Sequence, residues 1–265
     1  MTTVSDLVKF SNERWPIDQA AAWDNPGLAL GSMSQAVGKV LLAVDLTHEV
    51  LSEAEHGGFG MVFTHHPFLF KGPTTLSEDS LKGSIAARAI RAEISVFSAH
   101  TNADFVPSGV SHTLAKLLGL SRLRPLTGSG EGVVGDVQAT TLLDYARAIG
   151  KVLPSCAQGV LVQGDPEMTV SKVALVAGAG DSYLDVALES EVDVFITSDL
   201  RHHPASDFRE KAAISRNIAL ISIPHFAAEW PWLSVAAKEL SEAFPSVEFE
   251  VSEINTDPWT FAVMQ

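Results

Sequence analysis

The stretch "KVLLAVDLTHEVLSEAEHGGFGMVFTHH" (Lys39–His66) decides the fold of this chain. It opens with an apolar, β-rich run, Lys39–Leu46, that predicts a buried strand. Thr47 can cap the helix that follows, and a Gly-Gly pair ends that helix. A second apolar run, Met61–Thr64, predicts the next strand. Because a strand, a helix and a strand follow one another, we expect parallel pairing and an α/β fold.

The same alternation continues on both sides of a turn-rich middle segment. Apolar runs predict further strands, among them Ile94–Ala99 and Lys172–Gly178, with helices between them. We expect an N-terminal α/β domain over residues 1–125 and a C-terminal α/β domain over residues 126–265. The segment 126–168 is too short to hold a large inserted domain.

The two halves of the sequence echo each other. "VFTHHP" (Val62–Pro67) parallels "FITSDLRHHP" (Phe195–Pro204). "ISVFSAHTNAD" (Ile94–Asp104) parallels "IALISIPHFAAE" (Ile218–Glu229), and each is an apolar strand that ends in His-x-x-x-acid. We therefore expect two related α/β halves that carry polar residues at their strand ends.

Composition narrows the classes of function. The 265 residues are 46% hydrophobic and 19% charged, as in an ordinary globular protein. A formal charge of −14 opposes non-specific binding to nucleic acid, which is not expected as a partner. No apolar run approaches the roughly 20 residues that a membrane-spanning helix needs. The single cysteine, Cys156, cannot form an internal disulfide, so we expect a cytoplasmic protein.

Ligand-type side chains follow the predicted strands. In parallel α/β sheets, ligands gather beyond the carboxyl ends of strands. Three such ends carry imidazoles or carboxylates: His65-His66, His100–Asp104 and His225–Glu229. A fourth segment, Ser198–His203, resembles them. Mixed imidazole and carboxylate groups suit Zn, Mn, Fe, Co or Ni. The sequence therefore predicts a site for divalent transition metals.

Some of these residues have plainer interpretations. A single histidine at a strand end is most often a hydrogen-bonded structural residue, and His48, His56 and His112 are interpreted as surface or structural. His225 and Glu229 are four residues apart, which places them on one face of a helix that we expect to be interrupted near Pro231.

Other chemistries have less support in the sequence. Cys156 has no histidine near it in the sequence, which disfavours a thiol nucleophile. "VAGAGDS" (Val176–Ser182) could bind an anion or form a tight turn, and it lacks the third glycine of the dinucleotide fingerprint. No organic cofactor is therefore expected.

Six motifs, in order, resemble one known family. They are "WDNPGLALG" (Trp23–Gly31), "THHPFLFKG" (Thr64–Gly72), "HTNAD" (His100–Asp104), "TSDLRHHPASD" (Thr197–Asp207), "PHFAAE" (Pro224–Glu229) and "NTDPW" (Asn255–Trp259). Together they look like the NIF3 family, also known as GTP cyclohydrolase I type 2 homologs. The resemblance covers nearly the whole chain.

The resemblance implies an architecture and a set of ligands. The fold would be two similar α/β domains, each a three-layer α-β-α sandwich, with a dinuclear metal site in the cleft between them. The assembly would be a toroidal homohexamer. Five side chains would bind two divalent ions. His65 and His225 would bind one ion, and His66 and Asp104 would bind the other. Glu229 would bridge the two ions.

Further residues and the activity also follow from the resemblance. His100 and His203 would lie near the metals, where they could carry protons. Pro224, Ala228 and Ser198 depart from the family pattern, which affects loop shape and hydrogen bonding around the ligands. We expect a metal-dependent hydrolase of a small substrate, or alternatively a non-catalytic metal-binding scaffold or regulatory interaction protein. No nucleotide-recognition motif supports GTP as the substrate.

Overall fold

A computed structural model describes residues 1–263 as two compact units. The first unit comprises Met1–Ala103 and Leu233–Thr256, and the second comprises Asp104–Trp232 and the segment from Asp257. The first point of division falls after Ala103, earlier than the expected boundary near residue 125, and the chain returns to the first unit at Leu233.

The first unit is built on a five-stranded sheet. Its elements are α1 (Val4–Arg14), the short helix η1 (Ile17–Gln19), β1 (Gly27–Leu30), β2 (Lys39–Ala43), α2 (His48–His56), β3 (Met61–Thr64), α3 (Leu81–Arg91), β4 (Ser95–Ser98) and β11 (Glu248–Val251). The strand order is β1-β4-β3-β2-β11. β11, β2, β3 and β4 are parallel, as predicted, and β1 is antiparallel to β4.

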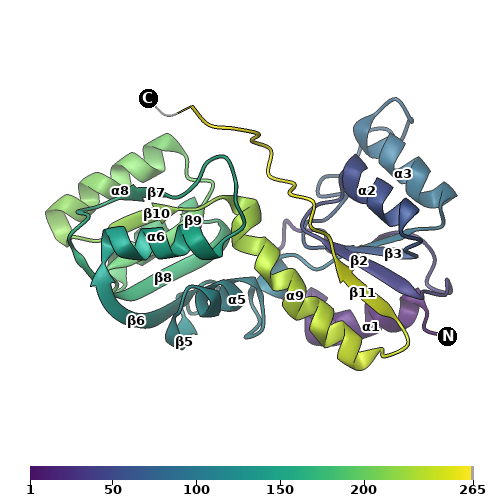
Figure 1. Cartoon of the computed structure of the whole chain (residues 1–265), viewed down its shortest axis with the longest axis horizontal. Coiled ribbons are helices and arrows are strands. Elements are labelled where there is room, and N and C mark those ends of the chain that lie inside the picture. Colours follow the sequence, from purple (N-terminus) through teal and green to yellow (C-terminus); the bar gives the residue numbers. More distant parts are fainter. Residues whose placement is uncertain (264–265) are drawn as a thin grey trace. The chain divides into compact units, whose positions relative to one another are not determined.

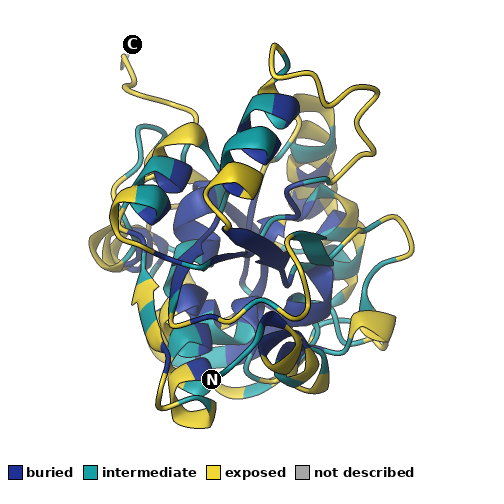
Figure 2. Cartoon of the chain, turned by 90° about the vertical axis from the view of Figure 1, so that its right-hand side faces the viewer, coloured by how far each residue is buried: buried dark blue, intermediate teal, exposed yellow. Residues whose placement is uncertain are grey.

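Apolar side chains on one face of this sheet form its core. Leu41, Val62 and Val96 are neighbours across β2, β3 and β4, and they belong to a buried cluster that also holds the apolar faces of α2 and α3. Figure 1 shows these two helices side by side over the sheet. Figure 2 shows the buried strands in dark blue among helices whose outer turns are exposed. The Thr47 side chain accepts a hydrogen bond from the backbone N–H of Val50, so the predicted cap of α2 is present.

The second unit is built on a six-stranded mixed sheet. Its elements are α5 (Val110–Leu117), β5 (Ser121–Pro125), β6 (Val133–Thr141), α6 (Leu142–Val152), β7 (Leu161–Gln163), β8 (Thr169–Ala179), η2 (Asp181–Tyr183), α7 (Leu184–Glu189), β9 (Val194–Ser198), α8 (His202–Ser215) and β10 (Ala219–Ser222). The strand order is β5-β6-β8-β9-β10-β7, with the three strands β8, β9 and β10 parallel. Two further helices contain the points of division, α4 (Thr101–Asp104) and α9 (His225–Ala243).

The expected interruption of α9 near Pro231 is wrong. The helix runs from His225 to Ala243 with the proline inside it. An internal proline costs about 3 kcal/mol because it removes one hydrogen bond and crowds a carbonyl. Trp232 and Leu233 are fully buried, and burial of each such side chain contributes about 1.5–3 kcal/mol. Burial of Trp232 and Leu233 therefore outweighs the cost of the proline inside the helix. No helix within residues 1–263 is long and apolar enough to cross a membrane.

Candidate metal site

The carboxyl ends of β3 and β4 bring three imidazoles together. Thr64, the last residue of β3, is paired with Ser98, the last residue of β4, so the residues that follow leave the sheet at the same edge. One ligand nitrogen from each of His65, His66 and His100 lies within 4.8 Å of the other two. The expectation that strand ends would gather these side chains is therefore met in the first unit, and this cluster could hold a metal ion.

Each of these imidazoles is held by an oxygen at its Nδ1 nitrogen. The contacts are His65 Nδ1 to the Ala99 carbonyl at 2.9 Å, His66 Nδ1 to Asp45 Oδ1 at 2.7 Å, and His100 Nδ1 to Asp24 Oδ1 at 2.7 Å. Carbonyl and carboxylate oxygens only accept hydrogen bonds, so Nδ1 is the donor in all three contacts. The Nε2 atom is then the one with a lone pair for a metal, which is how metal-binding histidines are usually oriented.

The Asp24 carboxylate is fixed by more than one partner. Its Oδ2 accepts from the backbone N–H of Thr101 at 3.1 Å and from the Thr101 hydroxyl at 2.5 Å. Burial raises the pKa of Asp24, but the hydrogen bonds from His100 and Thr101 and the His100 charge lower that pKa to about 2. Asp24 therefore stays ionised at neutral pH and keeps the proton of His100 on Nδ1. Sequence reasoning missed this role, because the partners are 76 residues apart.

Asp45 was also missed, although the sequence contained a signal. It lies two residues after the end of β2, as His66 lies two residues after the end of β3, and its second oxygen accepts from the Thr256 hydroxyl at 2.5 Å. We expect Asp45→Asn to weaken metal binding by about 10- to 100-fold, since the amide cannot hold the His66 tautomer as the carboxylate does. Titration with Zn²⁺ against a competing chelator measures this change. Asp79→Asn, in an exposed loop of the same unit, is the matched control, and equal affinity in both variants would contradict the assignment.

The second unit places a histidine and a buried glutamate in the first turns of α9. His225 Nε2 lies 2.8 Å from Glu229 Oε1, and His225 Nδ1 donates to Asp199 Oδ2 at 2.7 Å. The Glu229 residue is only 3% exposed. Burial lowers the pKa of His225, but the charge of Glu229 and the hydrogen bonds to Asp199 and Glu229 outweigh it and raise the pKa well above its ordinary value. A divalent ion that binds Nε2 has to displace this proton.

Gly178 leaves room for the Glu229 carboxylate. It ends the buried part of β8 with a φ of +76°, and a Cβ atom placed on it would lie 2.6 Å from Glu229 Oε1 and 3.4 Å from His225 Nε2. Position 178 therefore requires a glycine, because its backbone is left-handed and because a Cβ atom would collide with the Glu229 carboxylate. The donor set of imidazole nitrogen and carboxylate oxygen fits a borderline divalent metal.

Substitution of Gly178 should disturb this pair. We expect Gly178→Ala to lower the free energy of unfolding by about 1–3 kcal/mol more than Gly159→Ala does, because the methyl group crowds a carboxylate that cannot move into solvent. Gly159 has a similar φ of +63° but open space around its Cβ position, so it isolates the cost of the contact from that of the backbone. Thermal or urea unfolding of both variants measures the difference, and equal stability would show that the carboxylate moves freely.

Two other predicted site residues are placed differently. Asp104 ends α4 within the second unit, where burial, the charge of Glu131 and then that of Asp104 raise the pKa of Tyr183. His203 is exposed in the first turn of α8, with its ring against that of His202. The clusters of three or more ligand-type groups within residues 1–263 include neither Asp104 nor His203.

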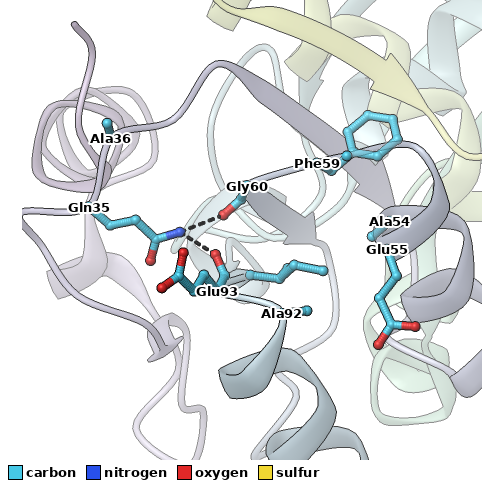
Figure 3. Close-up of a pocket in the computed structure, with 10 residues that line it drawn as sticks. Gln35, Ala36, Ala54, Glu55, Phe59, Gly60, Ala92 and Glu93 are labelled. Carbon is cyan, nitrogen blue, oxygen red and sulfur yellow. Dashed lines mark hydrogen bonds between the residues drawn. The ribbon is translucent and has the colours of Figure 1, made fainter.

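A pocket of about 480 Å³ lies in the first unit, away from the histidines. Its lining includes Gly60 and Ile94, which precede β3 and β4, whereas the imidazoles follow those strands. Figure 3 shows Gln35, Gly60 and Glu93 at this pocket. The Gln35 side chain crosses it and donates to the carbonyls of Gly60 and Glu93. The residues that line this pocket, all within the described part of the chain, include no histidine. We therefore place the candidate site at the carboxyl ends of the strands.

The fold and the oriented imidazoles define a class, a two-unit α/β protein with a histidine cluster that could bind a metal ion. Comparison with known proteins agrees with this class. Residues 2–258 match the Duf34/NIF3 (NGG1p interacting factor 3) family, and the chain belongs to that family.

Three relatives illustrate the match. The chain is 37% identical to a "GTP cyclohydrolase 1 type 2 homolog" of Streptomyces coelicolor, over 98% of this chain and 94% of the relative. A Staphylococcus aureus protein of known crystal structure has a TM-score of 0.89 at 28% identity and covers 98% of this chain and 99% of its own. The Bacillus cereus protein related to NIF3 has a TM-score of 0.90 at 21% identity, with the same coverage, and supports the fold.

Proposed function

We propose that this protein binds two divalent transition-metal ions per chain and uses them to hydrolyse a small substrate. The ligands in this proposal are the five that the family resemblance implied: His65, His66, Asp104, His225 and Glu229. The observation that carries the proposal is the orientation of the imidazoles. His66 donates Nδ1–H to an aspartate and His65 donates Nδ1–H to a carbonyl, so Nε2 is left as the ligand atom in both. His225 donates Nδ1–H to Asp199, and its Nε2 has to lose the proton shared with Glu229 before it binds an ion.

Hydrolysis needs an activated water and a place for developing negative charge. Divalent ions, when bound, lower the pKa of water and polarise a phosphoryl or carbonyl oxygen. The chain's own contribution is to place protons. His100, fixed at Nδ1 by Asp24, can accept a proton at Nε2 and return it to a leaving group. His203 remains a second candidate for this role, from the exposed first turn of α8.

An activity screen tests this proposal. Metal-loaded protein is offered phosphoester, peptide and nucleotide substrates, and Glu229→Ala serves as the inactive control. We expect turnover of at least one small substrate by wild type and none by the variant. Turnover that Glu229→Ala retains in full would reject the metal site as its source.

A non-catalytic role is the second candidate, as a metal-binding scaffold or regulatory interaction protein. The observation that favours it is the exposure of three large apolar side chains in the last described segment: Trp259, Phe261 and Val263. Metal binding without turnover of any substrate in the screen would support this role over hydrolysis.

The state of assembly is also a proposal. We propose a cytoplasmic homohexamer, supported by the family resemblance and by the single cysteine. Multi-angle light scattering at micromolar concentration is expected to give six times the chain mass of 28.3 kDa. A monomer under these conditions would contradict the hexamer and leave the metal proposal unaffected.

A further inference from the structure

Two exposed aromatic side chains lie beside the three imidazoles and have no part in the chemistry above. Trp23 is 63% exposed and Phe70 is 44% exposed. Their ring centroids are 5.7 Å apart, and each lies 6.0 Å from the centroid of His100. The three ring planes cross at 64–77°, which is the edge-to-face arrangement. Solvent therefore reaches two rings that are in contact with a candidate proton carrier.

The backbone on both sides of Trp23 is fixed. The Ala21 N–H donates to the Thr101 hydroxyl at 2.9 Å. On the other side, the Asp24 carboxylate accepts two hydrogen bonds from Thr101 as well as the one from His100. A loop that holds an exposed tryptophan between two such anchors has little freedom left to lose when a ligand binds.

The loop that carries Phe70 is tied to the same segment. The Asn25 side-chain amide donates to the carbonyl of Leu69, next to Phe70, at 2.8 Å. Phe68, two residues before Phe70, is 2% exposed and anchors this loop in the core. The two aromatic rings are thus held on neighbouring, mutually bonded loops, and their relative position is set before any ligand arrives.

A pair of rigid, exposed rings suits one kind of ligand. Exposed apolar groups that touch one another form a contiguous patch, and such patches mark binding sites. Flat rings stack on Trp and Phe with little loss of conformational freedom, and such stacking needs no hydrogen-bond pattern in the ligand. The ring of His100 also contacts those of His65 and His66, with centroids 5.1 and 5.4 Å away. A ring stacked on the pair would place its substituent next to the imidazole cluster.

We propose that Trp23 and Phe70 form a platform on which a planar aromatic ring stacks against the face of one ring and meets the other at its edge, and that the substrate is an aromatic compound bearing a hydrolysable group. The platform orients the ring while the group reaches the imidazoles. This inference rests on the proposed function, because that function makes the bound molecule a substrate. The stacking itself depends only on residues of the first unit.

A matched pair of probes tests the platform. Phenyl phosphate and cyclohexyl phosphate have similar size and equal charge and differ in aromaticity. Their affinities are measured by isothermal titration calorimetry with metal-loaded and with chelator-treated protein. We expect wild type to prefer phenyl phosphate by at least roughly fivefold, the low end of what one stacked ring contributes. Trp23→Leu should bring the ratio of affinities close to one, and Trp23→Phe should retain part of it.

Trp259→Leu is the matched control, because Trp259 is exposed to a similar extent, 67%, and lies in the last described segment. It should leave the preference unchanged. Equal binding of the two phosphates by wild type, no binding of phenyl phosphate, or a preference that Trp23→Leu retains would each overturn the platform. So would an altered oligomeric state of Trp23→Leu together with an unchanged preference, which would assign the rings to a contact between copies. Metal content of each sample is measured separately, so failure of the metal site is distinguished from failure of the platform.

Discussion

We expect the Glu229→Ala variant to lose more bound metal than a variant that lacks any other single ligand. In the proposed site this carboxylate would be a ligand of both ions and would neutralise charge between them. Its removal would leave two cations facing each other with one ligand fewer each, and we expect affinity to fall by more than roughly 100-fold. Asp104→Ala and His225→Ala should each cause a partial loss. Elemental analysis after reconstitution and desalting measures the order of these losses.

The best control for this variant lies on the same helix. Glu239 is unsuitable, because it forms an ion pair with Arg14 at 2.6 Å. Glu242 is exposed and lies 3.8 Å from Lys238, a surface contact of small expected energy. Glu242→Ala should therefore retain the full metal content. Wild-type metal content in Glu229→Ala would reject the bridging role and most of the proposed site with it.

Replacing His65 and His66 together should abolish binding of both ions. Each histidine is assigned to a different ion, so the double variant removes one imidazole ligand from each. His65 is fully buried and His66 is half-buried. Their backbone N–H groups donate to the carbonyls of Ala43 and Val44, and these hydrogen bonds are retained when the side chains are replaced. The loss should therefore be one of metal, with the fold of the first unit preserved.

The double variant His48→Ala with His56→Ala provides the comparison. Both histidines lie at the ends of α2 in the same unit, and the structure places them outside every cluster of ligand-type groups within residues 1–263. This control should bind metal as wild type does. Full retention of metal in the His65 and His66 double variant, or loss of metal in the control, would overturn the assignment of the site.

The sequence predicted those parts of the fold that depend on local pattern. The capped helix α2 and the strands β2 and β3 follow directly from the periodicity and punctuation of Lys39–His66. The histidine cluster was predictable as well, because the carboxyl ends of adjacent parallel strands share one edge. These features need only nearest neighbours along the chain or across one ladder.

Other features depend on pairs that are distant in sequence. The hydrogen bond between Asp24 and His100 joins a loop to a strand end, and no spacing rule connects the two. The continuity of α9 through Pro231 depends on burial of its neighbours, which a local rule for proline cannot include. Single-sequence reasoning therefore found the ligand-type side chains and missed the carboxylates that orient them.

The return of β11 to the first sheet has a consequence for biosynthesis. β11 pairs with β2, which lies about 200 residues earlier, whereas most of the second unit is one continuous stretch, Asp104–Trp232. Until residue 251 has left the ribosome, β2 presents an open edge to other chains. We expect the later stretch to acquire protease resistance first during translation, against the usual N-to-C order. Pulse proteolysis of released chains that end at Trp232 tests this, and a first unit already protected at that length would contradict it. Folding of the first unit, which carries the three imidazoles, would thus wait on β11.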